Sequence, residues 1–142
     1  MEQLSPAYLS TMAAQVGGLS AFLGGFAAAF LGTLLALGSR GRTASLSIGF
    51  AVSSSVAFVV AVVASTGLAA VLHPQAPQAV AASFPLIGAR ILMVLGFIIG
   101  LYALLFSLAL SGWSRSRGTG YTTSIAAGIG MALVSWVIVR VG

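Results

Sequence analysis

The chain has 142 residues, of which 59% are hydrophobic and only 5% are charged. A soluble globular domain carries about 25% charged residues, because its surface has to interact with water. This composition therefore excludes an ordinary soluble domain and suits a chain surrounded by lipid. The net charge of +5 comes from six arginines spread along the chain. Nucleic-acid binding requires many clustered phosphate contacts, so we expect no nucleic-acid partner.

Four apolar stretches are long enough to cross a bilayer, whose hydrocarbon core of about 30 Å requires about 20 helical residues. The predicted helices cover residues 7–37, 44–72, 86–110 and 122–141. Because the links between them are short, consecutive helices should run antiparallel. The expected fold is all-α: a polytopic membrane protein whose four transmembrane helices form two antiparallel hairpins. It makes a single domain over residues 1–142, with no soluble domain.

Local signals mark several helix boundaries. Ser5 followed by Pro6 is typical of a helix start, with serine as N-cap and proline at the first helical position. Gly38 predicts the end of the first helix, and Thr43 is the expected N-cap of the second. Pro74 should stop the second helix. No basic segment precedes the first apolar stretch, so we expect that stretch to be retained as a helix rather than cleaved as a signal peptide.

The arginines predict the orientation in the membrane. Four of them lie in the first and third links and mark the expected cytoplasmic side: Arg40, Arg42, Arg115 and Arg117. The opposite side carries Arg90 and Arg140, so both chain termini should face away from the cytoplasm. Heavy use of arginine, alanine and glycine fits a GC-rich bacterial genome. The expected location is therefore the bacterial cytoplasmic membrane.

Small residues recur at every fourth position inside the helices, where they share one face and let two backbones approach closely. The residues expected on helix-packing faces are Gly17, Gly24, Gly25, Gly32, Gly49, Ser53, Gly96, Gly100 and Gly128. Helices 7–37 and 44–72 should pack closely together. Helix 86–110 is bulkier and should face lipid most, or turn a bulky face toward a partner. Helix 7–37 has more small surface than one neighbour can use, which predicts an oligomer or a larger complex.

Residues that could carry chemistry are scarce. The chain has no cysteine, one histidine (His73) and one acidic residue (Glu2). Thiolate metal sites, paired carboxylates and an activated nucleophile are therefore not expected. We predict no catalytic residue, no metal and no cofactor, and we expect that the protein is not an enzyme.

Arg90 is the charged residue that invites a functional interpretation. It lies about one turn inside the third predicted helix, where an arginine can bind an anion, a lipid or a partner. The simpler interpretation is that its long side chain reaches the outer interface. The serines at 53–55 leave two interpretations open as well. They can line a polar path, or they can bond to backbone carbonyls of their own or a neighbouring helix.

Two functional hypotheses follow. The first is a non-catalytic integral membrane protein that serves as a homo-oligomeric or accessory subunit of a larger membrane complex. Its partners would be the lipid bilayer and other copies of itself or other membrane subunits. The alternative is a small oligomeric channel or transporter for a neutral or anionic solute, with Arg90 and the serines of helix 44–72, including Ser47 and Ser65 on either side of the cluster at 53–55, lining the path.

Overall fold

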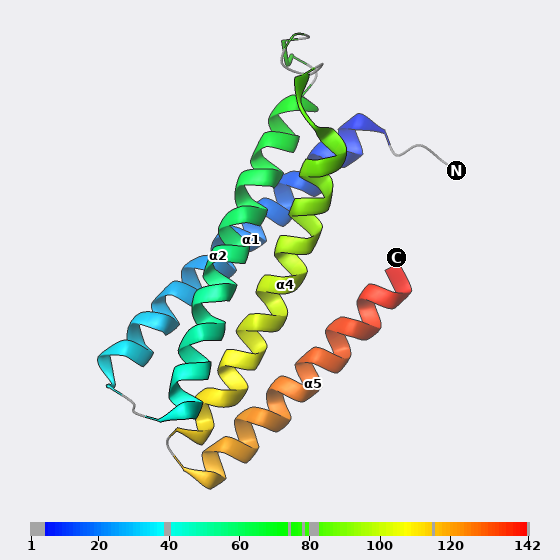
Figure 1. Cartoon of the computed structure of the whole chain (residues 1–142). Helices are drawn as coiled ribbons and strands as arrows, with labels where there is room; N and C mark the ends of the chain where they lie inside the picture. Colours follow the sequence, from blue (N-terminus) through cyan, green and yellow to red (C-terminus); the bar gives the residue numbers. More distant parts are fainter. Residues whose placement is uncertain are drawn as a thin grey trace.

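The structure is a computed structural model that describes residues 5–38, 41–73, 75–77, 79, 83–114 and 116–141. Its helices are α1 (Pro6–Ala36), α2 (Arg42–Val71), α4 (Leu86–Trp113) and α5 (Arg117–Val141) (Figure 1). All four are long and apolar enough to cross a membrane. The described part of the chain is thus all-helical, in line with the fold class expected from the sequence, and it suggests an integral membrane protein.

Both predicted boundary signals of α1 are confirmed. The Ser5 hydroxyl accepts a hydrogen bond from the backbone N–H of Tyr8 at 3.3 Å, and Pro6 occupies the first helical position. Gly38 follows the C-cap and has a φ of +59°, a left-handed conformation that glycine adopts at little cost. The two ends of α1 are therefore defined by residues within the segment itself.

The start of α2 differs from the prediction. Gly41, with a φ of +122°, is the N-cap, and the helix already includes Arg42. Thr43 therefore lies inside the first turn and is not the cap. The helix ends at Val71. Pro74, the predicted stop, lies outside the described residues.

The start of α5 also differs, since the helix begins at Arg117 and not at residue 122. Ser116 caps it, because its hydroxyl accepts a hydrogen bond from the backbone N–H of Thr119 at 3.2 Å. At the other side of the link, α4 continues to Trp113, beyond the predicted end at residue 110. The third link is consequently much shorter than the sequence suggested.

The helices α2 and α4 form the central pair of the bundle. α1 crosses against both of them, and α5 contacts α4 near the link between them and diverges from it toward the C-terminus (Figure 1). The close packing expected between the first two helices is confirmed. The expectation that the third predicted helix faces lipid most is wrong, because α4 contacts all three other helices. α5 is instead the least covered helix, since only 6% of an apolar stretch of 18 residues within it is buried.

The buried positions of the central pair alternate in steps of three and four residues. On α2 they include Ala44, Ser47, Ala51, Ser54, Phe58, Ala61, Ser65 and Leu68. On α4 they include Ala89, Met93, Gly96, Gly100, Ala103 and Ser107. This is coiled-coil spacing, which keeps a contact strip on one side of each helix. Rows of residues four apart turn about 40° with each step, so they leave the contact after two or three members.

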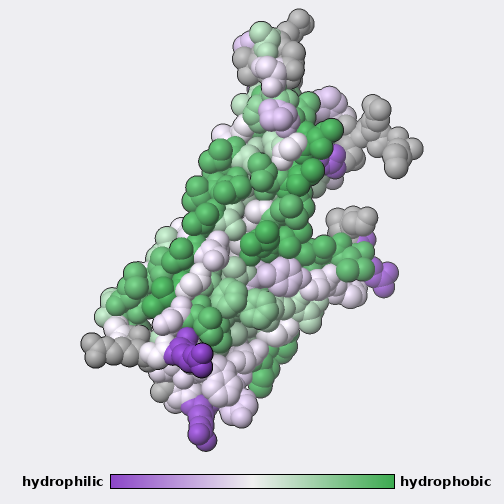
Figure 2. Space-filling model, viewed as in Figure 1, coloured by the Kyte–Doolittle hydropathy of each residue, from purple (hydrophilic) through white to green (hydrophobic). Residues whose placement is uncertain are grey.

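The outer surface of the bundle is strongly apolar. Side chains such as Phe22, Ile87 and Val139 are 73%, 78% and 80% exposed. Figure 2 shows hydrophobic residues along the middle of the visible face and the most hydrophilic ones toward its ends. An apolar surface of this extent favours aggregation in water. It fits helices whose surroundings are hydrocarbon.

Candidate functional site

Phe58 occupies the point where three helices meet. It is the largest fully buried side chain in the described part of the chain. A Cβ atom at Gly24 of α1 would lie 3.1 Å from the Phe58 Cβ, and one at Gly100 of α4 would lie 2.9 Å from its ring. The Phe97 ring meets it edge-on, with 6.2 Å between ring centroids. Glycines from two different helices thus form the recess that holds this one ring.

Gly96 marks the closest backbone approach between α2 and α4. A Cβ atom there would lie 2.9 Å from the carbonyl oxygen of Ala57 and 3.2 Å from the backbone nitrogen of Ala61. At Gly17 of α1, an added Cβ would lie 2.6 Å from the hydroxyl oxygen of Ser65. Together with Gly24 and Gly100, these glycines let the helices pack at short distance inside the chain.

The other residues expected on packing faces point elsewhere. Glycines with open space where a Cβ would stand are Gly25, Gly32, Gly49 and Gly128. Ser53 is exposed. Within the described residues, these five positions do not lie at a close helix contact. They remain on the outer surface of the bundle.

Serine hydroxyls join α2 to α4. Ser47 donates to the carbonyl oxygen of Ser107 at 2.9 Å, and Ser107 donates to the carbonyl oxygen of Ser47 at 2.7 Å. One heptad away, Ser54 donates to the carbonyl oxygen of Gly100 at 2.8 Å. Interhelical hydrogen bonds in membrane proteins contribute about 0.6 kcal/mol each on average. Because they join fixed positions on α2 and α4, these bonds favour one register of the two helices. By contrast, the buried hydroxyl of Ser20 on α1 has no partner among the described residues.

The serine cluster at 53–55 does not form one polar stripe. Ser54 faces α4, and Ser55 donates to the carbonyl oxygen of Ala51 on its own helix at 2.9 Å. Ser53 is exposed on another side. The described contacts therefore use two of these hydroxyls for backbone bonding. They add no support for a path lined by these serines and Arg90.

The arginines lie at the helix ends. Arg42 and Arg117 are exposed at the first positions of α2 and α5. Arg40 and Arg115, which carry the same orientation signal, lie outside the described residues. The positions that the structure describes are compatible with a polar boundary at this end of the bundle.

Two further arginines lie at the opposite end. Arg90 is exposed four residues after the start of α4 at Leu86. Arg140 is exposed at the end of α5, with its guanidinium carbon 5.7 Å from the centroid of the Trp136 ring. His73 is exposed just beyond α2, and its Nδ1 accepts a hydrogen bond from a backbone N–H. Arg90 lies only about one turn from its helix start, so its side chain can reach the interface.

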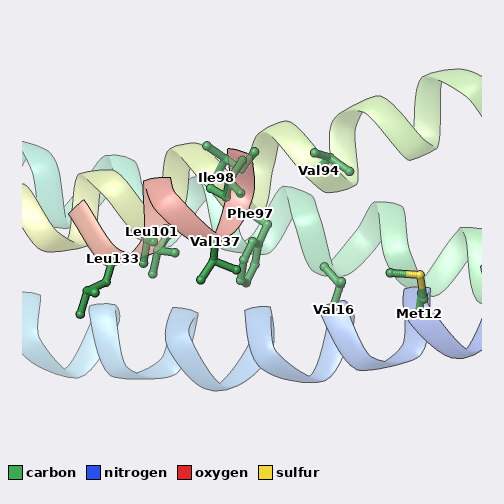
Figure 3. Close-up of a pocket in the computed structure, with 10 residues that line it drawn as sticks. Met12, Val16, Val94, Phe97, Ile98, Leu101, Leu133 and Val137 are labelled. Atoms are coloured by element: carbon green, nitrogen blue, oxygen red, sulfur yellow. The ribbon is translucent and has the colours of Figure 1, made fainter. Parts of the chain in front are cut away.

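An apolar groove opens between α1, α4 and α5, where α5 diverges from the rest of the bundle (Figure 3). Its volume is about 670 Å³, and all of its lining residues are apolar. Met12 and Val16 of α1 face Phe97 of α4 and Val137 of α5 across it. The groove therefore offers an apolar surface on three helices.

The described residues contain no group of three or more histidine, cysteine, aspartate or glutamate side chains that could hold a metal ion. The described features that bear on function are the packing faces, the arginines at the helix ends and the apolar groove. No protein-family model, no curated protein and no solved structure matches this chain.

Proposed function

We propose that the chain is a non-catalytic integral membrane protein that crosses the bilayer four times as two antiparallel hairpins. In this proposal it works as a subunit, assembled with copies of itself or with other membrane proteins. The observation that carries the proposal is an uncovered strip of small residues on α1.

This strip, the α1 outer seam, contains only alanine and glycine in steps of four and three. Its members are Ala14, Gly18, Ala21, Gly25, Ala28 and Gly32. All six are exposed, and a Cβ atom at any of the three glycines would meet nothing within 4 Å. The spacing is the same as that of the buried positions on α2 and α4. The seam thus has the residue spacing of a helix contact, but no helix in the described part of the chain packs against it.

Helix association in lipid depends on close backbone approach, because hydrocarbon provides no hydrophobic drive between helices. α1 already uses one small-residue strip, which includes Gly17 and Gly24, against α2. The outer seam lies one residue further along the chain, about 100° around the helix. A face that only met lipid would have no need for six small residues in contact spacing. We therefore expect a helix from another subunit to pack there.

The substitution Gly25→Leu tests the seam. It places a large side chain in the middle of the proposed contact and should raise the subunit dissociation constant at least about tenfold. The matched control is Gly49→Leu, since Gly49 is also a helical glycine with open space around it but lies on α2. The measurement is the subunit number in mild detergent or nanodiscs, by mass photometry. The proposal would be contradicted if the wild type were a monomer, or if Gly25→Leu and Gly49→Leu had the same subunit number.

The proposed orientation places the helix starts at Arg42 and Arg117 on the cytoplasmic side of a bacterial membrane and both termini outside. The chain has no cysteine, so single introduced cysteines report without background. With a membrane-impermeant maleimide on intact cells, Ser5→Cys should be labelled at once. Ser116→Cys should be labelled only after the membrane is permeabilised. The reverse labelling pattern would show the opposite orientation.

A further inference from the structure

The shape and lining of the apolar groove favour an acyl chain over a helix as its occupant. Its volume of about 670 Å³ falls in the range of small-molecule sites, about 300–1,000 Å³. Along α4 it extends from Val94 to Leu101, a length of about 10 Å. Its lining contains no glycine, alanine or serine, the residues that let a second helix approach closely. Branched and long side chains instead offer a surface on which a flexible hydrocarbon chain can lie.

Two arginines continue the groove-lining rows of α4 and α5 at one end. Arg90 lies four residues before Val94, and Arg140 lies three residues after Val137. Residues three or four apart share a helix face, so each arginine lies about one turn beyond the groove on the side that lines it. α4 begins at this end and α5 ends there. Both arginines therefore lie beyond the groove toward the same end of the bundle.

These arginines have no acidic partner in the described structure, because the described residues include no aspartate or glutamate. Arg140 lies over the Trp136 ring, which is 62% exposed and leaves the charge unneutralised. Arginine binds phosphate through two parallel hydrogen bonds. On α1, the exposed Tyr8 lies four residues before the groove-lining Met12.

We propose that the groove binds an anionic phospholipid, with an acyl chain along the apolar lining and the phosphate at Arg90 and Arg140. The site does not depend on the α1 outer seam. Val16 lines the groove and Gly18 belongs to the seam; two helical positions apart, they point about 160° away from each other. An oligomer built on the seam leaves the groove open, so the two proposals can fail separately.

The test is lipid retention by the full chain. The protein is exchanged into detergent with equal mole fractions of phosphatidylglycerol and phosphatidylcholine, and native mass spectrometry counts the lipid bound to each subunit. The wild type should retain phosphatidylglycerol. The double variant Arg90→Gln/Arg140→Gln should weaken that retention about 25-fold, since each arginine near an anionic lipid contributes a factor of about five. The matched charge control is Arg42→Gln/Arg117→Gln at the opposite end, which should retain the lipid.

A second arm tests the acyl chain. Val137→Trp fills the groove and should abolish retention, whereas Val139→Trp, at a position that is 80% exposed and outside the lining, should not. Equal retention of both lipids, or an equal loss in the charge control, would overturn the assignment of the headgroup. Retention by Val137→Trp would overturn the assignment of the groove. Arg90 and Arg140 are exposed, so their replacement should leave the fold intact. The retention measured for the arginine double variant therefore tests the proposal even if Val137→Trp fails to fold.

Discussion

Replacing Gly96 with leucine is expected to separate α2 from α4 and to destabilise the bundle by about 3 kcal/mol or more. Even a Cβ atom at this position would lie 2.9 Å from the carbonyl oxygen of Ala57. The obstacle is backbone in a regular helix, so it cannot turn aside as a flexible side chain would. The central helix pair would have to move apart, and its serine hydrogen bonds would lengthen with it.

The measurement is reversible unfolding in mixed micelles, followed by tryptophan fluorescence as the fraction of a denaturing detergent increases. Gly49→Leu is the matched control, because it makes the same chemical change at a helical glycine with open space around it. The control should unfold close to the wild-type midpoint. If Gly96→Leu unfolds at the midpoint of the control, the backbone contact between α2 and α4 is not as close as described.

The second large effect is expected at the Phe58 recess. Phe→Ala in a water-soluble core costs about 3–5 kcal/mol, which includes the transfer of the ring out of water. In lipid that transfer contributes little, since hydrocarbon is as apolar as the interior. The lost van der Waals contacts remain, so we expect Phe58→Ala to cost about 2 kcal/mol. The midpoint of the same unfolding titration reports it.

The pairing of Phe58 with Gly100 can be tested by a double-mutant cycle. Gly100→Ala alone should destabilise by about 1–3 kcal/mol, because the added methyl group would lie 2.9 to 3.1 Å from three ring atoms. Phe58→Leu removes much of that ring, so the two changes together should cost at least about 1 kcal/mol less than their sum. The combination of Phe58→Leu with Gly49→Ala should be additive. Strict additivity at Gly100 would mean that the ring does not occupy the recess.

The helices themselves could be predicted from the sequence to a large extent. The apolar length, the Ser5–Pro6 start and the Gly38 stop are local to one segment, so they predict a helix without knowledge of what that helix packs against. The sequence predicts too late a start for α5, because residues 118–120, Gly-Thr-Gly, resemble a loop. Ser116, three residues before Thr119, was the available capping signal.

The packing faces are harder to predict, because a pattern of small residues four apart does not match the alternating steps of three and four that the helix contacts use. Gly17 and Gly24 lie in contacts, whereas Gly25 and Gly32, read from the same helix, face outward. The central position of α4 was missed for a related reason. The average side-chain size of the helix is large, but Gly96 and Gly100 bring its small residues to one side.

The sequence by itself determined that the chain forms four long apolar helices with polar ends, because hydrophobic length, composition and capping residues act along each helix separately. Only the tertiary structure decided which faces meet, that Phe58 fills a recess between glycines of two other helices, and that α5 diverges to leave an apolar groove. The physical reason is that nearly every face of these helices is apolar. Hydrophobicity then cannot choose between faces, and the choice falls to the mutual fit of large and small side chains across the helix contacts.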